Sequence, residues 1–227
     1  MSIPPLPRWL GRVGARCVPA WCAVALILAI GSGCQAPAYV LDAVLPQADI
    51  PAVHRPEDRV TTVFVEDRDN ALPQPPLRTA IAASVAHYLQ RERVVTEFTN
   101  PGDLERLRLN EENFRNWSIA RIGRELEAEQ VLYVTVERFH VADPEQTRGP
   151  NAHVRAKLID VESGERIFPE RDSQGHQVRT EMRFQHRQPD SYGHSALLAQ
   201  HLAQRVGEDV AKLFYSHKPR AVGSGFD

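Results

Sequence analysis

Val131-Leu132-Tyr133-Val134-Thr135-Val136 is the stretch that decides the fold of this chain. β-Branched, aliphatic and aromatic residues follow one another there without a break, which is typical of a strand covered on both faces inside a sheet. The residues just before it, 118–129, place Ile119, Ile122 and Leu126 on one side of a helix. We therefore expect a helix that passes directly into a central strand.

The residues after this strand predict a hairpin and a long final helix. Apolar and charged residues alternate over 154–158, so this strand should have one covered and one solvated face. The turn at 162–165 should lead into a short strand at 166–168. A second alternating run, 178–184, is a possible edge strand, and apolar spacing predicts a helix over 195–217.

The residues before the central stretch predict two strands and two helices. β-Branched and aromatic residues indicate strands at 60–65 and 94–98. Between them, apolar residues recur every four positions over 77–92, which predicts an amphipathic helix. Asn100-Pro101-Gly102-Asp103 combines a capping side chain, a first-turn proline and an acid, so another helix should begin there.

These elements together predict an α/β fold in a single domain, residues 59–218. The order is strand-helix-strand-helix-helix-strand-strand-strand-helix, with the run at 178–184 as a possible additional strand. Strands separated by helices favour parallel pairing, and the later hairpin adds antiparallel strands. We expect a mixed sheet with helices packed on its faces.

The N-terminal residues 1–33 have the features of an export signal. The only charges there are Arg8, Arg12 and Arg16, and an uncharged run of about 14 residues follows, short of the ~20 that a spanning helix needs. Ser32-Gly33-Cys34 then resembles the cleavage site of bacterial lipoproteins. That resemblance implies cleavage between Gly33 and Cys34 and diacylation of Cys34; a plain secretory signal is the alternative.

Residues 34–58 are predicted to form a tether, and residues 219–227 a flexible tail. Four prolines occur in the first segment without helical periodicity. By resemblance to enterobacterial sorting, Gln35 implies the periplasmic face of the outer membrane. Removal of the leader leaves a net charge of about −5. A mildly acidic chain is a poor candidate for nucleic-acid binding. The resemblance to lipoproteins implies the membrane as a partner, and the resemblance described below implies an envelope protein.

No motif in the sequence indicates catalysis, a metal or a cofactor, and we expect none of the three. His194 and His201 are seven positions apart but lack a third ligand at a recognisable spacing. Glu66, Asp67 and Asp69 follow the first predicted strand at its carboxyl end, where α/β sheets often place their sites. A hydrolase that uses these acids with a histidine is one interpretation, and a polar turn is the other.

Phe114 and Trp117 are the candidate interaction residues of the sequence. Large aromatics close together contribute strongly to protein interfaces when they are exposed. They also pack readily inside a domain, under the helix that follows, and this alternative stays open.

The segment 120–126 that leads into 131–136, and the hairpin at 154–168, resemble a group of envelope proteins. The group contains the curli-secretion lipoprotein, the penicillin-binding-protein activator lipoprotein, the small exopolysaccharide-export lipoprotein and the amino-terminal domain of the Tol-system propeller protein. The resemblance implies a periplasmic domain that binds protein or assembles into a ring. Val134 stands where the group commonly has glycine, and the chain lacks the long insertions of a curli-type pore.

The leading hypothesis is therefore a non-enzymatic, lipid-anchored outer-membrane protein that acts as a protein-binding adaptor in envelope assembly, secretion or cell-wall regulation. The first alternative is a homo-oligomeric ring that takes part in export of a polymer or protein. The third is the hydrolase.

Overall fold

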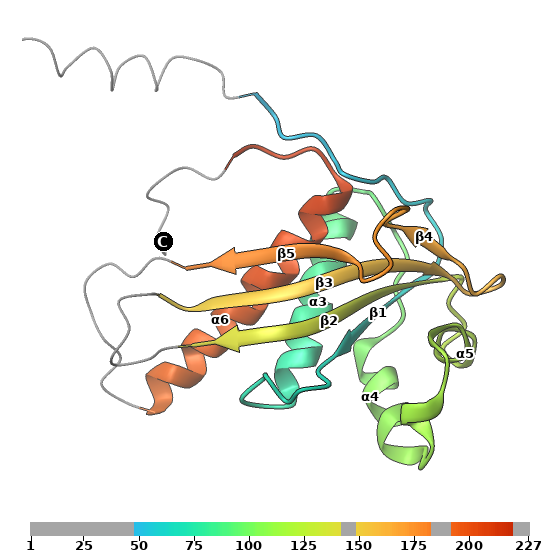
Figure 1. The fold of residues 1–227 in the computed structure, drawn as a ribbon, viewed down its shortest axis with the longest axis horizontal. Coiled ribbons are helices and arrows are strands. Elements are labelled where there is room, and N and C mark those ends of the chain that lie inside the picture. Colours follow the sequence, from blue (N-terminus) through green and yellow to red (C-terminus); the bar gives the residue numbers. More distant parts are fainter. Residues whose placement is uncertain (1–47, 142–148, 183–191, 220–227) are drawn as a thin grey trace, which may run out of the picture. The chain divides into compact units, whose positions relative to one another are not determined.

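The computed structural model describes residues 48–141, 149–182 and 192–219. They form a mixed five-stranded sheet with helices packed on it (Figure 1). The α/β class expected from the sequence is confirmed. The predicted leader, the cleavage site at Gly33 and Cys34, most of the tether and the tail lie outside the described residues.

The sheet is built around β2, Gln130–His140, as its central strand. β1, Thr61–Glu66, pairs with β2 in parallel, and β3, Asn151–Asp160, pairs with it in antiparallel fashion. The next two strands, β4 (Arg166–Phe168) and β5 (His176–Glu181), both pair with β3, at its opposite ends. The parallel crossover and the antiparallel hairpin are thus both present.

Two long helices cover one face of this sheet. They are α3, Pro76–Arg91, and α6, Tyr192–Ala211, which is followed by the 3-10 turn Lys212–Phe214. Both lie behind the strands in Figure 1. The four-residue repeat of α3 is buried in the main core together with one side of α6 and the inward residues of the strands. Burial of these apolar side chains is the main force that holds the helices to the sheet.

Shorter helices cover one end of the other face. These are α4, Pro101–Asn110, a 3-10 turn at Phe114–Asn116, and α5, Ile119–Glu125. The predicted cap at Asn100 is confirmed, because its side chain accepts the N–H of Gly102 at 2.8 Å. Ser118 caps α5 in the same way and accepts the N–H of Arg121 at 3.2 Å. A second, smaller apolar core lies beneath these helices.

The strand expected at residues 94–98 is reduced to one parallel bridge, between Phe98 and Thr61. Arg93 adopts a left-handed conformation, with φ of 54°, directly after α3 and turns the chain sharply. The segment therefore meets β1 at a single point, where the backbone of Thr61 bonds the carbonyl of Glu97 and the N–H of Thr99 at 3.0 Å each. Val94 and Val95 are buried in the main core instead of forming a ladder.

Residues 48–58, which we name the strap, belong to the folded domain and not to a free tether. Ile50 exchanges two backbone hydrogen bonds with His217, at 2.7 and 3.0 Å, and the N–H groups of Val53 and His54 both reach the carbonyl of Leu213. Buried Gln130 donates to the carbonyl of Glu57 at 3.0 Å. The folded unit therefore begins at Ala48, eleven residues before the expected start at Arg59.

Candidate functional site

The second face of the sheet is only partly covered, because its helices are short. The second apolar core covers Phe64, Tyr133 and Ile159, near one end of β1, β2 and β3. Beyond Tyr133 and Lys157 the strands continue with no described helix packed on this side, as Figure 1 shows. We call this surface the open face. Its residues on β2, β3 and β5 are Thr135, Glu137, Arg138, His153, Arg155, Lys157, Gln177, Arg179 and Glu181.

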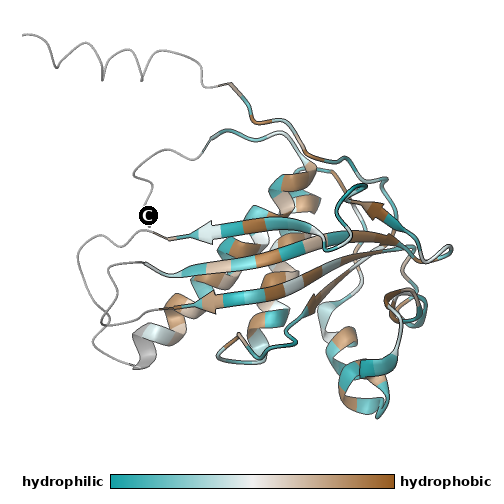
Figure 2. Cartoon of the chain, in the orientation of Figure 1, coloured by the Kyte–Doolittle hydropathy of each residue, from teal (hydrophilic) through white to brown (hydrophobic). Residues whose placement is uncertain are grey.

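The pleat of the strands explains why the open face is polar. Along β3 buried and half-buried residues alternate, with Val154 and Ala156 turned to the main core and Arg155 and Lys157 to the open face. β5 follows the same rule, since Val178 and Thr180 are buried between exposed neighbours. Hydrophilic residues recur along β2, β3 and β5 in Figure 2. The predicted alternation of the hairpin is confirmed.

Arg155 lies at the middle of the open face and is held by ion pairs. Its guanidinium contacts the carboxylate of Glu137 on β2, and its Nη1 atom lies 3.7 Å from Asp172 in the loop between β4 and β5. The same Nη1 donates to the carbonyl of Gly175 at 3.4 Å. These contacts fix the position of Arg155.

Lys157 lies next to Arg155 on the same face and opposite Tyr133. Burial, together with the guanidinium groups of Arg166 and Arg68, lowers the pKa of the Lys157 ammonium below its ordinary value and outweighs the opposite effect of the Asp172 carboxylate. Among the residues that the structure describes, no hydrogen bond or ion pair joins this ammonium. Lys157 is therefore a half-buried cation that has three guanidinium groups and one carboxylate, that of Asp172, in its surroundings.

The acids that the sequence singled out are held by contacts at the end of β1. Glu66 accepts the hydroxyl of Tyr133 and is paired with Arg68 at 2.7 Å. Asp67 accepts the backbone N–H groups of Ala71 and Leu72, at 2.7 and 3.1 Å, and so organises the turn that follows. Asp69 is exposed. The structure gives Asp67 the role of a polar turn residue, which was one of the two interpretations.

Phe114 and Trp117 lie close together but differ in exposure. Phe114 is buried and meets Phe64 edge to face at 6.0 Å between ring centroids. Trp117 is half-buried, and the guanidinium of Arg121 lies 3.8 Å from the centre of its ring. The two do not form an exposed pair, because packing against β1 draws Phe114 into the core.

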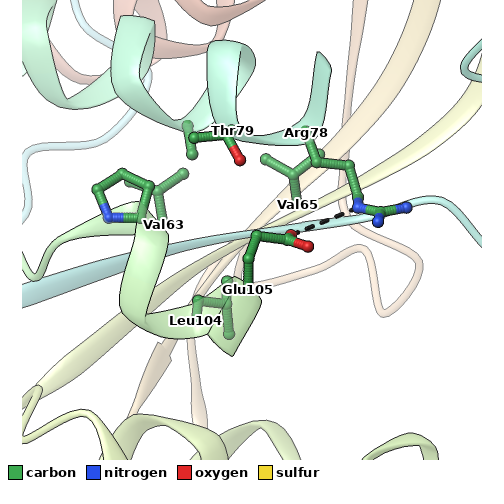
Figure 3. Close-up of a pocket in the computed structure, with 8 residues that line it drawn as sticks. Val63, Val65, Arg78, Thr79, Leu104 and Glu105 are labelled. Atoms are coloured by element: carbon green, nitrogen blue, oxygen red, sulfur yellow. Dashed lines mark hydrogen bonds and ion pairs between the residues drawn. The ribbon is translucent and has the colours of Figure 1, made fainter. Parts of the chain in front are cut away.

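A small cleft lies between α3, α4 and β1 (Figure 3). Its lining includes Val63, Val65 and Leu104, together with Arg78 and Glu105, which form an ion pair of 3.4 Å. The space inside it is about 10 Å³, which is hardly enough for one water molecule. The open face is the larger feature.

The histidines do not converge on a metal site within the described residues. His201 is exposed on α6, and the side chain of His194 lies outside the part that the structure describes. No helix in the described ranges is both long and apolar enough to cross a bilayer.

No protein-family model matches the chain, and no curated protein matches it in sequence. Solved structures to which it is similar include the PelC dodecamer from Paraburkholderia phytofirmans, at 17% identity and a TM-score of 0.38, covering 75% of this chain and 96% of that one. Lipoprotein GNA1162 from Neisseria meningitidis gives 14% and 0.38, with 66% and 98% covered. Protein XCC0632 from Xanthomonas campestris gives 10% and 0.42, with 74% and 90% covered. Similarities of this size assign neither a family nor a function.

Sequence reasoning identified the polar side of β3 but did not recognise it as a site. An alternating strand predicts only that one side is solvated. The lengths of the elements could have indicated an uncovered surface. β2 has 11 residues and β3 has 10, whereas α5, which covers their ends, has only 7. Strands that extend so far past a short helix leave part of a face open.

Proposed function

We propose that this protein is a non-enzymatic lipoprotein of the cell envelope that binds a protein partner through the open face. The observation that carries the proposal is the set of charged residues on β2, β3 and β5, on the part of the second face that no described helix covers. Cys34 supplies the lipid anchor, and the periplasmic face of the outer membrane is the proposed location. The adaptor role in assembly, secretion or cell-wall regulation is part of this proposal.

The open face supports binding more than catalysis. Protein surfaces recognise each other through complementary charges that are held in place before contact. Arg155 is such a charge, because Glu137 and Gly175 hold it from two sides. The hydrolase alternative has less support, because both carboxylate oxygens of Asp67 already accept backbone N–H groups.

Self-assembly is the second candidate function, and the observation that favours it is the position of β5. Within the described residues β5 pairs with β3 on one side only. An unpaired strand edge is a template for another strand, including that of a second copy.

Photo-crosslinking in intact cells tests the proposal. A photoreactive amino acid is placed at Gln177 on the open face, and in a control variant at the exposed Glu112 near α4. We expect adducts with another envelope protein from position 177 and none from position 112. Equal adducts from both positions, or none from 177, would contradict the open face as the binding surface.

The solution mass of residues 35–227 separates the two candidates. Light scattering after gel filtration should give a monomer if the protein is an adaptor. A large closed oligomer, with crosslinks only to other copies, would replace the adaptor by a ring.

A further inference from the structure

We propose that Lys157 is the centre of a subsite on the open face that binds a carboxylate side chain of the protein partner. The inference rests on the proposed function and adds the chemistry of the contact. It follows from the arrangement of four cations around one point of the sheet.

The strand register brings these cations together. Lys157 lies opposite Tyr133, whose hydroxyl oxygen is 3.3 Å from the Nη2 atom of Arg68. Arg155 is two residues away on β3, on the same side of the pleat. Arg166 pairs with Ile159, two residues from Lys157 in the other direction. The guanidinium groups of Arg68, Arg155 and Arg166 all act on the charge of the Lys157 ammonium, and the carboxylate of Asp172 acts in the opposite direction.

Each guanidinium has contacts of its own, and the ammonium does not. Arg68 is paired with Glu66, Arg155 is paired with Glu137, and Arg166 donates to the carbonyls of Pro169 and Glu170. In the described ranges nothing bonds the Lys157 ammonium. A half-buried cation without a partner costs free energy, and an incoming carboxylate removes that cost through a charge-assisted hydrogen bond.

The loop between β4 and β5 holds Lys157 in position. Gly175 has φ of +103°, and a Cβ atom there would stand 3.0 Å from Cγ of Lys157. The loop backbone can therefore lie directly against the lysine stem only because this residue is glycine. Arg155 bonds the carbonyl of Gly175 and connects the loop to the face. The subsite is in place before a partner arrives.

The mixed charge of the open face favours a protein over a uniform polyanion. Glu66, Glu137, Asp172 and Glu181 stand among the cations. A polymer that carries a negative charge on every unit would meet these acids as well as the cations. A protein surface can place an acid against Lys157 and a base against the acids, which is how complementary interfaces reach specificity.

A titration of the Lys157 side chain by nuclear magnetic resonance tests the subsite in the mature chain. The probes are an acetylated alanine peptide amide that carries one glutamate and one lysine (the glutamate peptide), the same peptide with glutamine in place of glutamate (the glutamine peptide), and oligogalacturonate. We expect the glutamate peptide, and not the glutamine peptide, to raise the pKa of Lys157, because a bound carboxylate favours the ammonium form. Lys157→Gln should weaken binding of the glutamate peptide at least tenfold, Lys157→Arg should retain it, and the control Arg106→Gln, on α4, should leave it unchanged.

The outcomes separate this inference from the proposed function. If the glutamate peptide leaves the Lys157 pKa unchanged while the crosslinks from position 177 persist, the subsite is wrong and the binding face stands. Tighter binding of oligogalacturonate than of the glutamate peptide would overturn the protein assignment. If Lys157→Gln fails to fold, Arg68→Gln replaces it, since 70% of the Arg68 side chain is exposed, and an unchanged affinity in that variant would also overturn the subsite.

Discussion

Asp160 is the residue that closes the hairpin between β3 and β4. Its carboxylate accepts both the backbone N–H and the hydroxyl of Ser163, each at 2.8 Å, and the Nη1 atom of Arg59 at 2.9 Å. The two Ser163 bonds and the bond from Arg59 lower the pKa of Asp160 to about 2. One side chain thus joins the turn to the start of β1.

We expect Asp160→Asn to lower the free energy of unfolding by about 1 kcal/mol at neutral pH, a modest value because the pair lies near the surface. The folded-state pKa is depressed, so the stabilisation is fully present above the ordinary pKa of 3.8 and is lost as pH falls towards 2. Urea denaturation at pH 7, 4 and 2.5 measures this. A difference between variant and wild type that did not shrink across that range would contradict the assignment.

At the scale of single elements, the close contact between α3 and α6 depends on two small residues. Ser84 donates its hydroxyl to the carbonyl of Gln204 at 2.7 Å. A Cβ atom on Gly207 would lie 2.5 Å from Cβ of Ser84 and 2.8 Å from the carbonyl oxygen of Ile81. The helices can approach this closely only because Gly207 has no side chain.

Gly207→Ala should therefore destabilise the domain by about 1–3 kcal/mol, because overpacking outweighs the better helix propensity of alanine. Thermal unfolding followed by circular dichroism gives the midpoint. Gln204→Ala is the matched control, since this exposed residue lies on the same helix and only its backbone is used. Equal midpoints for Gly207→Ala and wild type would show that the helices can separate at little cost.

His54 holds the strap against the end of the sheet. Its ring stacks on Phe168 at 5.1 Å between centroids and meets Phe214 edge to face at 6.4 Å. Burial lowers the pKa of His54 and outweighs the opposite effect of Glu170. The neutral ring is thus the form that packs.

Because the pKa of docked His54 is depressed, strap docking should be strongest above the ordinary value of 6.5 and should weaken as pH falls below it. Hydrogen exchange at the amides of Val53 and His54, corrected for intrinsic rates, measures docking at pH 7.5 and 5.5. We expect faster relative exchange at pH 5.5 and no such change in His54→Phe. Identical protection of these amides at pH 7.5 and pH 5.5 in the wild type would contradict a role of His54 in strap docking.

At the scale of the whole molecule, the docked strap shortens the length of chain between the domain and the proposed lipid anchor. With the folded unit beginning at Ala48, only residues 35–47 connect it to Cys34. Fully extended, this length of chain spans about 45 Å at most. Under the proposed function the open face therefore works close to the membrane that holds the lipid.

Cys34→Ala should release the protein from the membrane fraction, because the proposed anchor is the lipid on this sulfur. Cell fractionation followed by immunoblotting checks the prediction. Cys22→Ala, which changes a cysteine of the predicted leader, is the control and should leave the protein in the membranes. Membrane retention of Cys34→Ala would refute the anchor.

The sequence by itself determined the kind and position of most elements. The period of apolar residues, the caps at Asn100 and Ser118 and the hairpin turn at 162–165 all act over a few neighbouring positions. Such short-range patterns predict a helix or a strand because the backbone geometry of each is local. The central place of residues 131–136 could be predicted as well, since only a strand covered on both faces is apolar throughout.

Only the tertiary structure decided which surfaces stay open and which segments dock. The open face exists because α4 and α5 end where β2 and β3 continue. These helices and strands occupy different segments of the chain, so a local sequence pattern does not show which of them extends further. The strap binds through backbone groups of residues far away in the chain, so its prolines looked like those of a free tether. The burial of Phe114 also depends on a distant contact, because its partner Phe64 is fifty residues away. Contacts between residues so far apart produce no periodic pattern in the local sequence.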